Sequence, residues 1–412
     1  MRPGQRIARR IALGMLARLR AGQLTVVEGA RQRTVLGRGS PRALVQVRSP
    51  RLWPALLRGS RGLAEAYRDG LWEAPDLVAL FRLGARNVWA LDRWRRRVAP
   101  LRVPLQVLSG IRVRNTPSRS RRAAAAHYDL GDRLFALMLD ETMMYSSAYF
   151  PRAGMTLAEA SRAKLELICE DLALGPADHV LEIGSGWGGF ALHAAGSRGC
   201  RVTTTTISRD QYEHARARVR EAGLEDRVTV LFEDYRRLQG RYDKLVSIEM
   251  IEAVGPRELG SFFARCSQLL GERGLMLLEA IVIDDRAHAV EKASRSFIRT
   301  HIFPGGCLPS LAVIARCLAR RTDMSTVGLR DLTPHYAETL RRWRANFERA
   351  AQLERLGYDE RFRRLWRLYL AYCQAGFEER RIGVVQMLLA KPLWRASLLP
   401  SARQGARPAA AA

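Results

Sequence analysis

Cysteine is scarce in this chain, and long apolar runs are missing. The six cysteines contain no CxxC pair and lie at Cys169, Cys200, Cys266, Cys307, Cys317 and Cys373. This spacing excludes a zinc framework and a disulfide scaffold, and it fits a reducing cytoplasm. No apolar stretch approaches the roughly 20 residues that span a bilayer. We therefore expect no transmembrane helix and no metal site.

Lysine is nearly absent too, and arginine supplies almost all of the positive charge. Four of the 68 basic residues are lysines, Lys164, Lys244, Lys292 and Lys391, and the formal net charge is +27. Residues 1–125 contain 27 arginines, no lysine and 6 acidic residues, so the excess charge belongs mainly to the N-terminal third. Such a region favours a polyanionic partner, either nucleic acid or an anionic membrane surface.

Tryptophan is concentrated in the same third. Four of the eight tryptophans lie there, namely Trp53, Trp72, Trp89 and Trp94. Tryptophan beside arginine is typical of a membrane interface, and packing in an ordinary core is the alternative.

The 412 residues are too many for one compact core and predict more than one domain. Residues 1–20 have the pattern of a basic amphipathic helix, which is also typical of a mitochondrial presequence. Residues 23–49 alternate as in a small antiparallel sheet, and residues 53–98 have a helical pattern. We expect a basic N-terminal α+β accessory domain at 1–111, a linker at 112–126, a catalytic domain at 127–395 and a disordered tail at 396–412.

Strand and helix patterns alternate in the second part of the chain. Thr156 and Glu159 form a capping-box pattern before the first helix. A long helical insertion is expected at 285–322. Strand patterns recur at 179–183, 201–207, 227–232, 243–250, 274–283, 324–329 and 381–389. This alternation predicts an α/β fold with a parallel, doubly wound sheet.

The strongest local signal is a glycine-rich turn after the strand at 179–183. Gly184, Gly186 and Gly189 match the GxGxxG pattern of dinucleotide enzymes, whereas Gly184, Gly186 and Gly188 match the GxGxG pattern of adenosylmethionine enzymes. A dinucleotide enzyme needs an acid at the end of the second strand. Here Asp210 lies beyond that strand end, after Ser208, a natural N-cap. The context therefore favours adenosylmethionine.

Several longer strings together resemble the cyclopropane-fatty-acyl-phospholipid synthase family, which includes the mycolic acid cyclopropane synthases. They occur in the family's order and are HYDLGDRLFALMLDETMMYSSAYF (127–150), VLEIGSGWGGFA (180–191), TISRDQ (206–211), SIEMIEAVG (247–255), IFPGGCLPS (302–310) and HYAETLRRW (335–343). The resemblance implies a class I methyltransferase fold, Rossmann-like, with a seven-stranded sheet and a helical lid.

The resemblance also implies where S-adenosylmethionine binds. The cofactor lies on Gly184 and Gly186, and Tyr128, Tyr145 and Ser146 close over it. Its methionine–ribose region meets Thr206 and Gln211, and its adenosine end lies near Glu233 and Asp234. For Tyr128 and Tyr145, core packing is the alternative.

In the family a bound bicarbonate acts as the base, held by Glu, His and Tyr side chains and by backbone groups. The resemblance assigns the Glu to Glu252, the Tyr to Tyr336, and the backbone contacts to Ser147 and Ile281. The His position is occupied by Glu279. Three anions in one apolar pocket cannot all stay ionised, so either Glu279 is protonated or the bicarbonate is absent. We expect Glu279 to replace it as base or cation stabiliser, or else to turn away and pair with an arginine.

The implied function is S-adenosylmethionine-dependent transfer of a one-carbon group to the double bond of an unsaturated phospholipid acyl chain. The family default is a cyclopropane product, and a methyl- or methylene-branched chain is the close alternative. A nucleic-acid methyltransferase and a silent lipid-binding homologue are alternatives of other classes. We expect a cytoplasmic protein on the inner face of the membrane, docked through residues 1–125, without nucleic acid. An organellar location stays open, as does the oligomeric state, with a homodimer as one option.

Overall fold

The computed structural model describes residues 1–29, 32–98, 132–293, 296–350 and 353–395. These residues form a four-stranded sheet near the N-terminus and a seven-stranded sheet in the rest of the chain. The predicted linker at 112–126 and tail at 396–412 lie outside the described residues. The domain boundary between the two sheets therefore stays a prediction.

The N-terminal body begins with a helix and continues with a sheet. Its elements are α1 (Pro3–Leu16), β1 (Gly22–Glu28), β2 (Gln32–Arg38), β3 (Arg42–Val47), α2 (Leu52–Leu56), α3 (Ser60–Arg68), β4 (Trp72–Glu73) and α4 (Leu77–Val98). The strand order is β2-β1-β3-β4. Strand β1 pairs antiparallel with β2 but parallel with β3, so the expectation of a purely antiparallel sheet was wrong.

The parallel pairing requires the chain after β2 to cross the start of β1. The Gln23 N–H donates to the Pro41 carbonyl at 2.9 Å, and this bond fixes the crossing. Gly22 has φ 79°, and a Cβ there would lie 2.5 Å from the Pro41 oxygen. Only glycine tolerates both the left-handed backbone and the close approach.

Helix α1 packs on the small sheet through Ala8 and Ala12. Two of its larger apolar residues point outward instead, with Ile7 62% and Ile11 43% exposed. Trp53 and Trp72, by contrast, are buried in the core. These two tryptophans therefore follow the core alternative, whereas the side chains of Trp89 and Trp94 lie outside the described part of the chain.

The larger body alternates strands with helices over most of its length. Its elements are α7 (Asp132–Met138), α8 (Leu157–Asp171), β5 (His179–Ile183), α9 (Gly189–Arg198), β6 (Arg201–Thr206), α10 (Arg209–Glu221), β7 (Val228–Phe232), β8 (Tyr242–Ile248), η2 (Ile251–Ala253), α11 (Leu259–Leu269), β9 (Leu270–Ile283), α12 (Asp285–Ala293), η3 (Ile298–Ile302), α13 (Leu311–Arg321), β10 (Ser325–Asp331), α14 (Thr333–Arg349), α15 (Glu360–Glu378) and β11 (Ile382–Ala390). The expected strands are all present, and the expected insertion consists of α12, the π-helix η3 and α13.

The seven strands have the order β10-β11-β9-β8-β5-β6-β7. Strand β11 runs antiparallel to both of its neighbours, β9 and β10, so the sheet is mixed rather than wholly parallel. The central strands are buried on both faces, as their apolar runs require. Thr156 and Glu159 form the expected capping box, and Ser208 caps α10.

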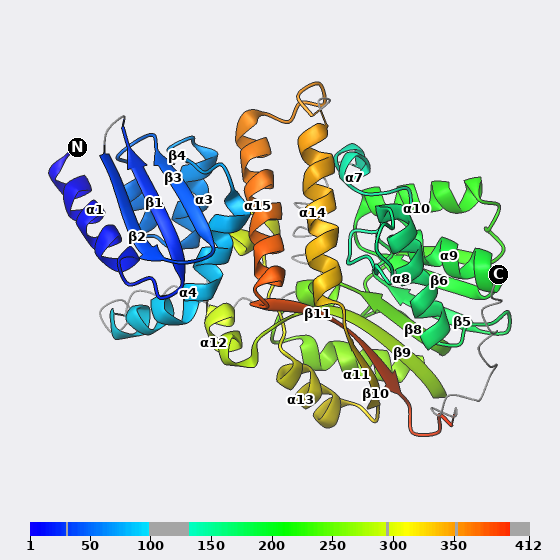
Figure 1. Ribbon diagram of the computed structural model, residues 1–412. Helices are drawn as coiled ribbons and strands as arrows, with labels where there is room; N and C mark the ends of the chain where they lie inside the picture. The colour runs from blue at the N-terminus through cyan, green and yellow to red at the C-terminus, as the bar shows by residue number, and fades with distance from the viewer. Residues whose placement is uncertain (30–31, 99–131, 294–295, 351–352, 396–412) are drawn as a thin grey trace, which may run out of the picture.

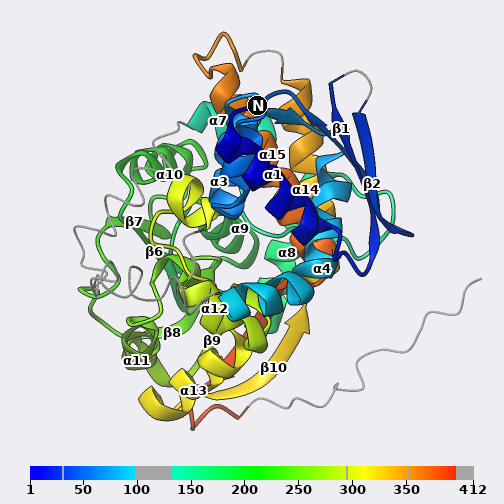
Figure 2. The same ribbon diagram turned by 90° about the vertical axis from the view of Figure 1, so that its left-hand side faces the viewer.

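Helices α14 and α15, which the sequence analysis did not anticipate, stand between the two bodies (Figure 1). Helix α15 contacts α3 and α4 of the N-terminal body as well as α14. Ion pairs line the contact, including Arg82 with Glu379 at 2.7 Å and Arg364 with Glu73 at 2.6 Å. In Figure 2, α1 and α3 lie in front of these helices. Among the described residues, no helix is long and apolar enough to cross a membrane.

Candidate functional site

The glycine-rich turn joins β5 to α9 at the carboxyl edge of the sheet. Gly184 has φ 99°, Gly186 has φ 49° and Gly188 has φ 86°, so all three occupy the left-handed region. A Cβ on Gly186 would meet no atom within 4 Å, whereas one on Gly184 would lie 3.1 Å from the Met250 side chain. The turn therefore borders open space at Gly186, where a ligand can approach the backbone closely.

Gly189 has a different role from the glycines of the turn. A Cβ there would lie 2.6 Å from Met144 Sδ and from the Thr142 carbonyl. This glycine lets the 142–144 segment pack on the start of α9. Gly189 therefore serves packing, and its environment does not by itself distinguish the two glycine patterns.

The residues expected around the cofactor occupy neighbouring strand ends. Thr206 Oγ1 donates to Gln211 Oε1 at 2.8 Å, and both side chains are buried. Glu233 follows β7 and is partly exposed, and its Oε1 accepts from the Asp234 N–H at 2.9 Å. Asp234 is buried and pairs with Arg236 at 2.6 Å. Of these acids, Glu233 is therefore the one with carboxylate capacity left for a ribose or adenine.

The segment that covers this edge contains Tyr145 and Ser146. The Tyr145 hydroxyl lies 2.8 Å from that of Tyr369, and its ring stacks on Trp343 with 5.2 Å between centroids. Ser146 Oγ accepts from the Lys164 ammonium at 2.6 Å. Tyr128, which the resemblance adds to this cover, lies outside the described residues.

Glu249, which the sequence analysis did not select, is at the centre of a buried carboxyl cluster. Its Oε1 accepts from the Ser147 N–H and its Oε2 from the Tyr336 hydroxyl, both at 2.7 Å. Its own N–H donates to the Glu279 carbonyl at 2.9 Å. Its backbone is left-handed, with φ 46°. Both carboxylate oxygens thus have a fixed donor.

Glu252 is the second carboxyl group of the cluster. Its Oε1 accepts from the Ile281 N–H at 2.5 Å, and its Oε2 is buried without a hydrogen-bond partner among the described residues. Burial raises the pKa of Glu252 to about 7, and the negative charge of Glu279 acts in the same direction. This group is therefore partly protonated near neutral pH.

Glu279 lies on β9, and its side chain contacts residues other than Ser147 and Tyr336. Its Oε2 accepts from Gln386 Nε2 at 2.8 Å, and its Oε1 lies 3.9 Å from Lys164 Nζ. The partner is thus a lysine rather than the arginine that the sequence analysis considered. The Ser147 N–H and the Tyr336 hydroxyl, which the resemblance directs at an anion, both bond to Glu249.

Electrostatics in this cluster raise the pKa of Glu249 and of Tyr336. Burial raises the pKa of Glu249 well above its ordinary value, and the charges of Glu279 and Glu252 raise it further. The bonds from Tyr336 and Ser147 act in the opposite direction. Burial and the Glu249 charge raise the pKa of Tyr336, so its hydroxyl stays protonated and donates.

Aromatic rings surround the cluster. Tyr336 packs on Phe377 with 4.4 Å between centroids and meets Trp343 edge-on at 5.9 Å. Tyr145 and Tyr369 continue this wall through their hydroxyl contact. The arrangement combines a buried carboxylate with aromatic faces, which together stabilise positive charge and accept a proton.

The contacts of Glu249 could not be derived from its neighbours in the sequence. One signal was available, because Glu249 directly follows a buried strand, β8, and so lies at the carboxyl edge where ligands bind in α/β sheets. The string SIEMIEAVG drew attention to Glu252 instead.

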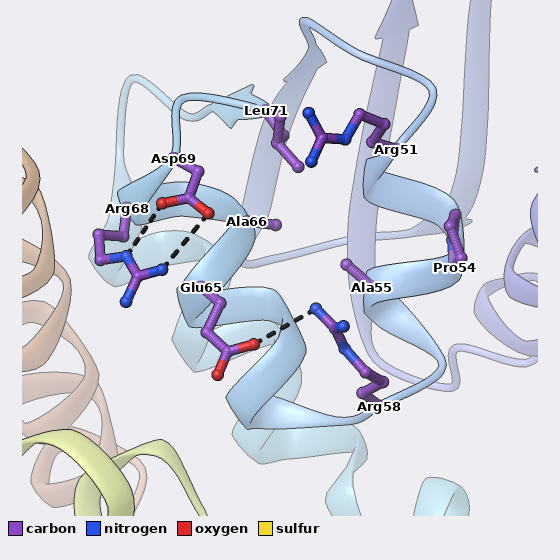
Figure 3. Close-up of a pocket in the computed structure, with 9 residues that line it drawn as sticks. All are labelled: Arg51, Pro54, Ala55, Arg58, Glu65, Ala66, Arg68, Asp69 and Leu71. Atoms are coloured by element: carbon purple, nitrogen blue, oxygen red, sulfur yellow. Dashed lines mark hydrogen bonds and ion pairs between the residues drawn. The ribbon is translucent and has the colours of Figure 1, made fainter.

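A separate cavity of about 410 Å³ lies in the N-terminal body. Figure 3 shows Arg58 facing Glu65 and Arg68 facing Asp69 at its rim, with Arg51 near Leu71. The two ion pairs measure 3.3 and 3.0 Å. The cavity contains more cations than acids and is distinct from the carboxyl cluster.

Comparisons with known proteins agree on one family. The family model described as mycolic acid cyclopropane synthetase matches residues 115–387. Tuberculostearic acid methyltransferase UfaA1 of Mycobacterium tuberculosis is 38% identical over 343 residues, which cover 80% of this chain and 79% of the relative. Cyclopropane-fatty-acyl-phospholipid synthase of Escherichia coli is 35% identical over 360 residues, covering 86% and 89%.

A solved structure extends this similarity to three dimensions. Mycolic acid cyclopropane synthase CmaA1, complexed with SAH and CTAB, superimposes with a TM-score of 0.61 at 33% identity. The match covers 66% of this chain and 98% of that one. This chain therefore shares its fold over two thirds of its length with a protein that binds SAH, and the remaining third lies outside the match.

Proposed function

The chain belongs to the mycolic acid cyclopropane synthetase family and is an S-adenosylmethionine-dependent methyltransferase that modifies fatty acids, and from this premise we propose the rest of its reaction. It transfers a methyl group to the double bond of an unsaturated phospholipid acyl chain. Glu249 then accepts a proton from the resulting carbocation. The contacts of Glu249 with Ser147 and Tyr336 carry this proposal.

The residues at the glycine turn fit the cofactor. Gly184 and Gly186 provide the close backbone approach, and Thr206, Gln211 and Glu233 supply polar groups at the next two strand ends. When bound, S-adenosylmethionine supplies an electrophilic methyl group with a neutral leaving thioether. The chain's own residues must then exclude water, stabilise charge on the acyl chain and remove a proton.

Glu249 suits the last of these tasks. Its two oxygens are held by two donors, so the carboxylate needs no reorganisation when the proton arrives. A raised pKa makes it a stronger proton acceptor than an exposed carboxylate. Aromatic rings of Tyr336, Trp343 and Tyr145 lie close by to stabilise the cation. In this proposal, the role that the sequence analysis gave to Glu279 passes to Glu249.

We infer that the reaction does not use bicarbonate. Ser147 and Tyr336 already donate to Glu249, and the Ile281 N–H already donates to Glu252. A bicarbonate anion would be disfavoured beside these buried carboxyl groups wherever one of them is ionised. Turnover in bicarbonate-free buffer under argon tests this inference. A rate that falls on degassing and returns with added bicarbonate would restore the family's base.

For the product, we favour a methyl- or methylene-branched acyl chain. Of the two curated relatives described above, the UfaA1 methyltransferase is the more similar. In addition, the Glu249 carboxylate, which is part of the chain, takes the place of a bound bicarbonate. The cyclopropane acyl chain, supported by the Escherichia coli synthase, is the second candidate. Both products arise from the same cation. Loss of a proton from the added methyl group closes the cyclopropane ring, whereas loss of a proton from the chain, or from the methyl group after a hydride shift, leaves a methyl- or methylene-branched alkene.

Mass spectrometry of lipids from expressing cells fed methyl-labelled methionine distinguishes the products. A methyl- or methylene-branched chain formed by proton loss gains one labelled carbon, keeps a double bond and still takes up hydrogen, whereas a cyclopropane chain is already saturated. Fragmentation then separates a branch from a ring. A labelled cyclopropane alone would reverse our preference, and no labelled lipid at all would refute the proposed reaction.

For access to its substrate, we propose peripheral docking of the N-terminal body on the inner face of an anionic membrane. Exposed Ile7 and Ile11 lie on α1 among arginines that include Arg6 and Arg10. An apolar stripe beside basic side chains is typical of interfacial helices. The arginine-rimmed cavity of Figure 3 offers an additional place for a lipid phosphate. Cosedimentation with anionic and neutral vesicles tests the docking.

A further inference from the structure

A row of polar side chains crosses three strands beneath the carboxyl cluster. Arg330 on β10, Gln386 on β11 and Glu279 on β9 are register neighbours. Arg330 Nη1 donates to Gln386 Oε1 at 3.2 Å, and Gln386 Nε2 donates to Glu279 Oε2 at 2.8 Å. The row therefore runs unbroken from an edge strand into the core.

Helix α8 closes this row at both ends. Asp171 pairs with Arg330 at 2.5 Å at the outer end. Lys164, two turns earlier on the same helix, lies with its Nζ 3.9 Å from Glu279 Oε1 at the inner end. The five residues form a ring that locks α8 to the three strands. The Gln386 amide thus fixes one oxygen of Glu279, and the Lys164 ammonium faces the other, which accepts no hydrogen bond among the described residues.

Lys164 has an unusual environment. Among the described residues it is the only lysine or arginine that is buried, with 0% of its surface exposed. A buried ammonium is costly unless it is paired and hydrogen-bonded. Lys164 meets this condition through Glu279 and through a 2.6 Å bond to Ser146 Oγ.

Both members of this pair are connected to Glu249. Ser146, which Lys164 holds, directly precedes Ser147, whose N–H donates to Glu249. Glu279, the other member, accepts the Glu249 N–H with its backbone carbonyl. The pair therefore links two groups that orient the Glu249 carboxylate, the Ser147 N–H and the Glu279 backbone carbonyl.

The pair also sets the charge around Glu249. The groups that face this carboxylate from the elements packed on it are mostly acidic. They are Glu279 on β9, Glu252 on η2, Tyr336 on α14 and Tyr369 on α15. Glu182 on β5 is a further buried acid that interacts with the charge of Lys164. Lys164 on α8 is the cation nearest to this set by the contacts described, so its loss would leave Glu279 uncompensated.

We propose that Lys164 and Glu279 form a positioning pair for the base, in which Lys164 neutralises Glu279 and anchors Ser146 so that the Ser147 N–H meets Glu249. This inference rests on the proposed role of Glu249. Neither residue touches the reacting atoms. Their effect reaches the reaction through the geometry and charge of the Glu249 carboxylate.

Opposite shifts of the pH–rate profile test the pair. Lys164→Met leaves the Glu279 charge unbalanced, which raises the pKa of Glu249 and moves the low-pH limb upward by about one unit. Glu279→Gln removes a like charge and moves that limb downward. The double variant removes both charges and brings the limb back toward that of the wild type. We also expect kcat of Lys164→Met to fall about tenfold or more, because Ser146 loses its anchor.

Lys391→Met is the matched control, because Lys391 also pairs with a carboxylate, Asp323, at 2.7 Å, but just beyond the end of β11. It should leave the pH profile unchanged. If Lys164→Met alone fails to fold, the double variant carries the test, because it leaves no charge unpaired. Single variants that shift in the same direction, or a double variant displaced as far as either single, would overturn the pair.

A binding measurement separates this inference from the proposed reaction. Calorimetry with SAH should show at least about fivefold weaker binding to Lys164→Met, because Ser146 is expected over the cofactor, and unchanged binding to Lys391→Met. An inactive wild type with this binding difference would refute the reaction and leave only the anchoring of Ser146 by Lys164. An active wild type with unshifted profiles and equal SAH affinity would keep the reaction and refute the pair.

Discussion

The N-terminal body and the catalytic body use charge in opposite ways. In the N-terminal body, arginines lie at the surface and pair with partly exposed acids, as Arg58 does with Glu65. In the catalytic body, carboxyl groups are buried and a single buried lysine faces them. Solvent screens the surface arginines, so their ion pairs add little stability and their positive charge is available for docking on an anionic surface. Burial strengthens the interactions among the carboxyl groups and the lysine, so these interactions set the protonation states of the carboxyl groups.

The largest expected effect on activity comes from a substitution among the buried carboxyl groups. Glu249→Gln keeps the size and the acceptor oxygen but cannot take a proton, so kcat should fall by about 10²- to 10⁴-fold. Transfer of labelled methyl to an unsaturated phospholipid measures it. Glu272→Gln, at an exposed glutamate early in β9, is the control and should be silent. A Glu249→Gln variant within threefold of the wild type would exclude Glu249 as the base.

The contact between the two bodies gives the next effect. Arg364 donates to the Tyr67 and Trp72 carbonyls as well as to Glu73. Arg364→Met leaves these acceptors unpaired and should lower the free energy of unfolding by about 1–3 kcal/mol.

Arg361, paired with Asp69 and 61% exposed, provides the comparison. Arg361→Met should cost at most about 1 kcal/mol. Urea unfolding of both variants makes the measurement. Equal losses would mean that burial does not distinguish the two arginines.

Tyr336→Phe sharpens the account of the carboxyl cluster. The ring still packs on Phe377, but the hydroxyl no longer donates to Glu249. Because that bond favours the ionised carboxylate, its loss raises the pKa of Glu249 and moves the low-pH limb of kcat/KM to higher pH. The rate at neutral pH should fall about tenfold. A limb that moves to lower pH would contradict the assigned direction of the bond.

The smallest effect is expected at the surface. Arg10→Gln on α1 removes one exposed charge beside Ile11 and should weaken binding to anionic vesicles about fivefold at low salt. Arg220→Gln on α10 removes the same charge from the other body and should leave binding unchanged. Cosedimentation over a salt series measures both. Equal losses would assign docking to net charge rather than to the N-terminal body.

Local patterns in the sequence predicted local structure well. The capping box at Thr156 and Glu159, the cap at Ser208 and the strands of the large sheet were all found where expected. These features depend on neighbours within a few residues. The parallel pairing of β3 with β1 was missed, because it depends on the chain crossing over Gly22.

The carboxyl cluster depends on distant parts of the chain. Ser147 lies 102 residues from Glu249, and Tyr336 lies 87 residues away. The resemblance supplied Ser147, Tyr336 and Glu252, but it could not show which carboxylate the donors meet. Glu279 differs from the family pattern and so attracted attention, whereas its partner Lys164 looked like an ordinary helix residue. Only the three-dimensional structure joins them.

The left-handed backbone of Glu249 has a consequence for the evolution of this protein. A non-glycine residue at φ 46° costs roughly 1 kcal/mol, and a buried carboxyl group adds to that cost. Glu249→Gly would relieve this strain but leave the Ser147 N–H and the Tyr336 hydroxyl without their acceptor, so it should abolish turnover without raising the melting temperature. A laboratory population selected for heat resistance alone would therefore gain nothing from glycine at this position, and the glutamate is retained by its two donors as well as by the reaction.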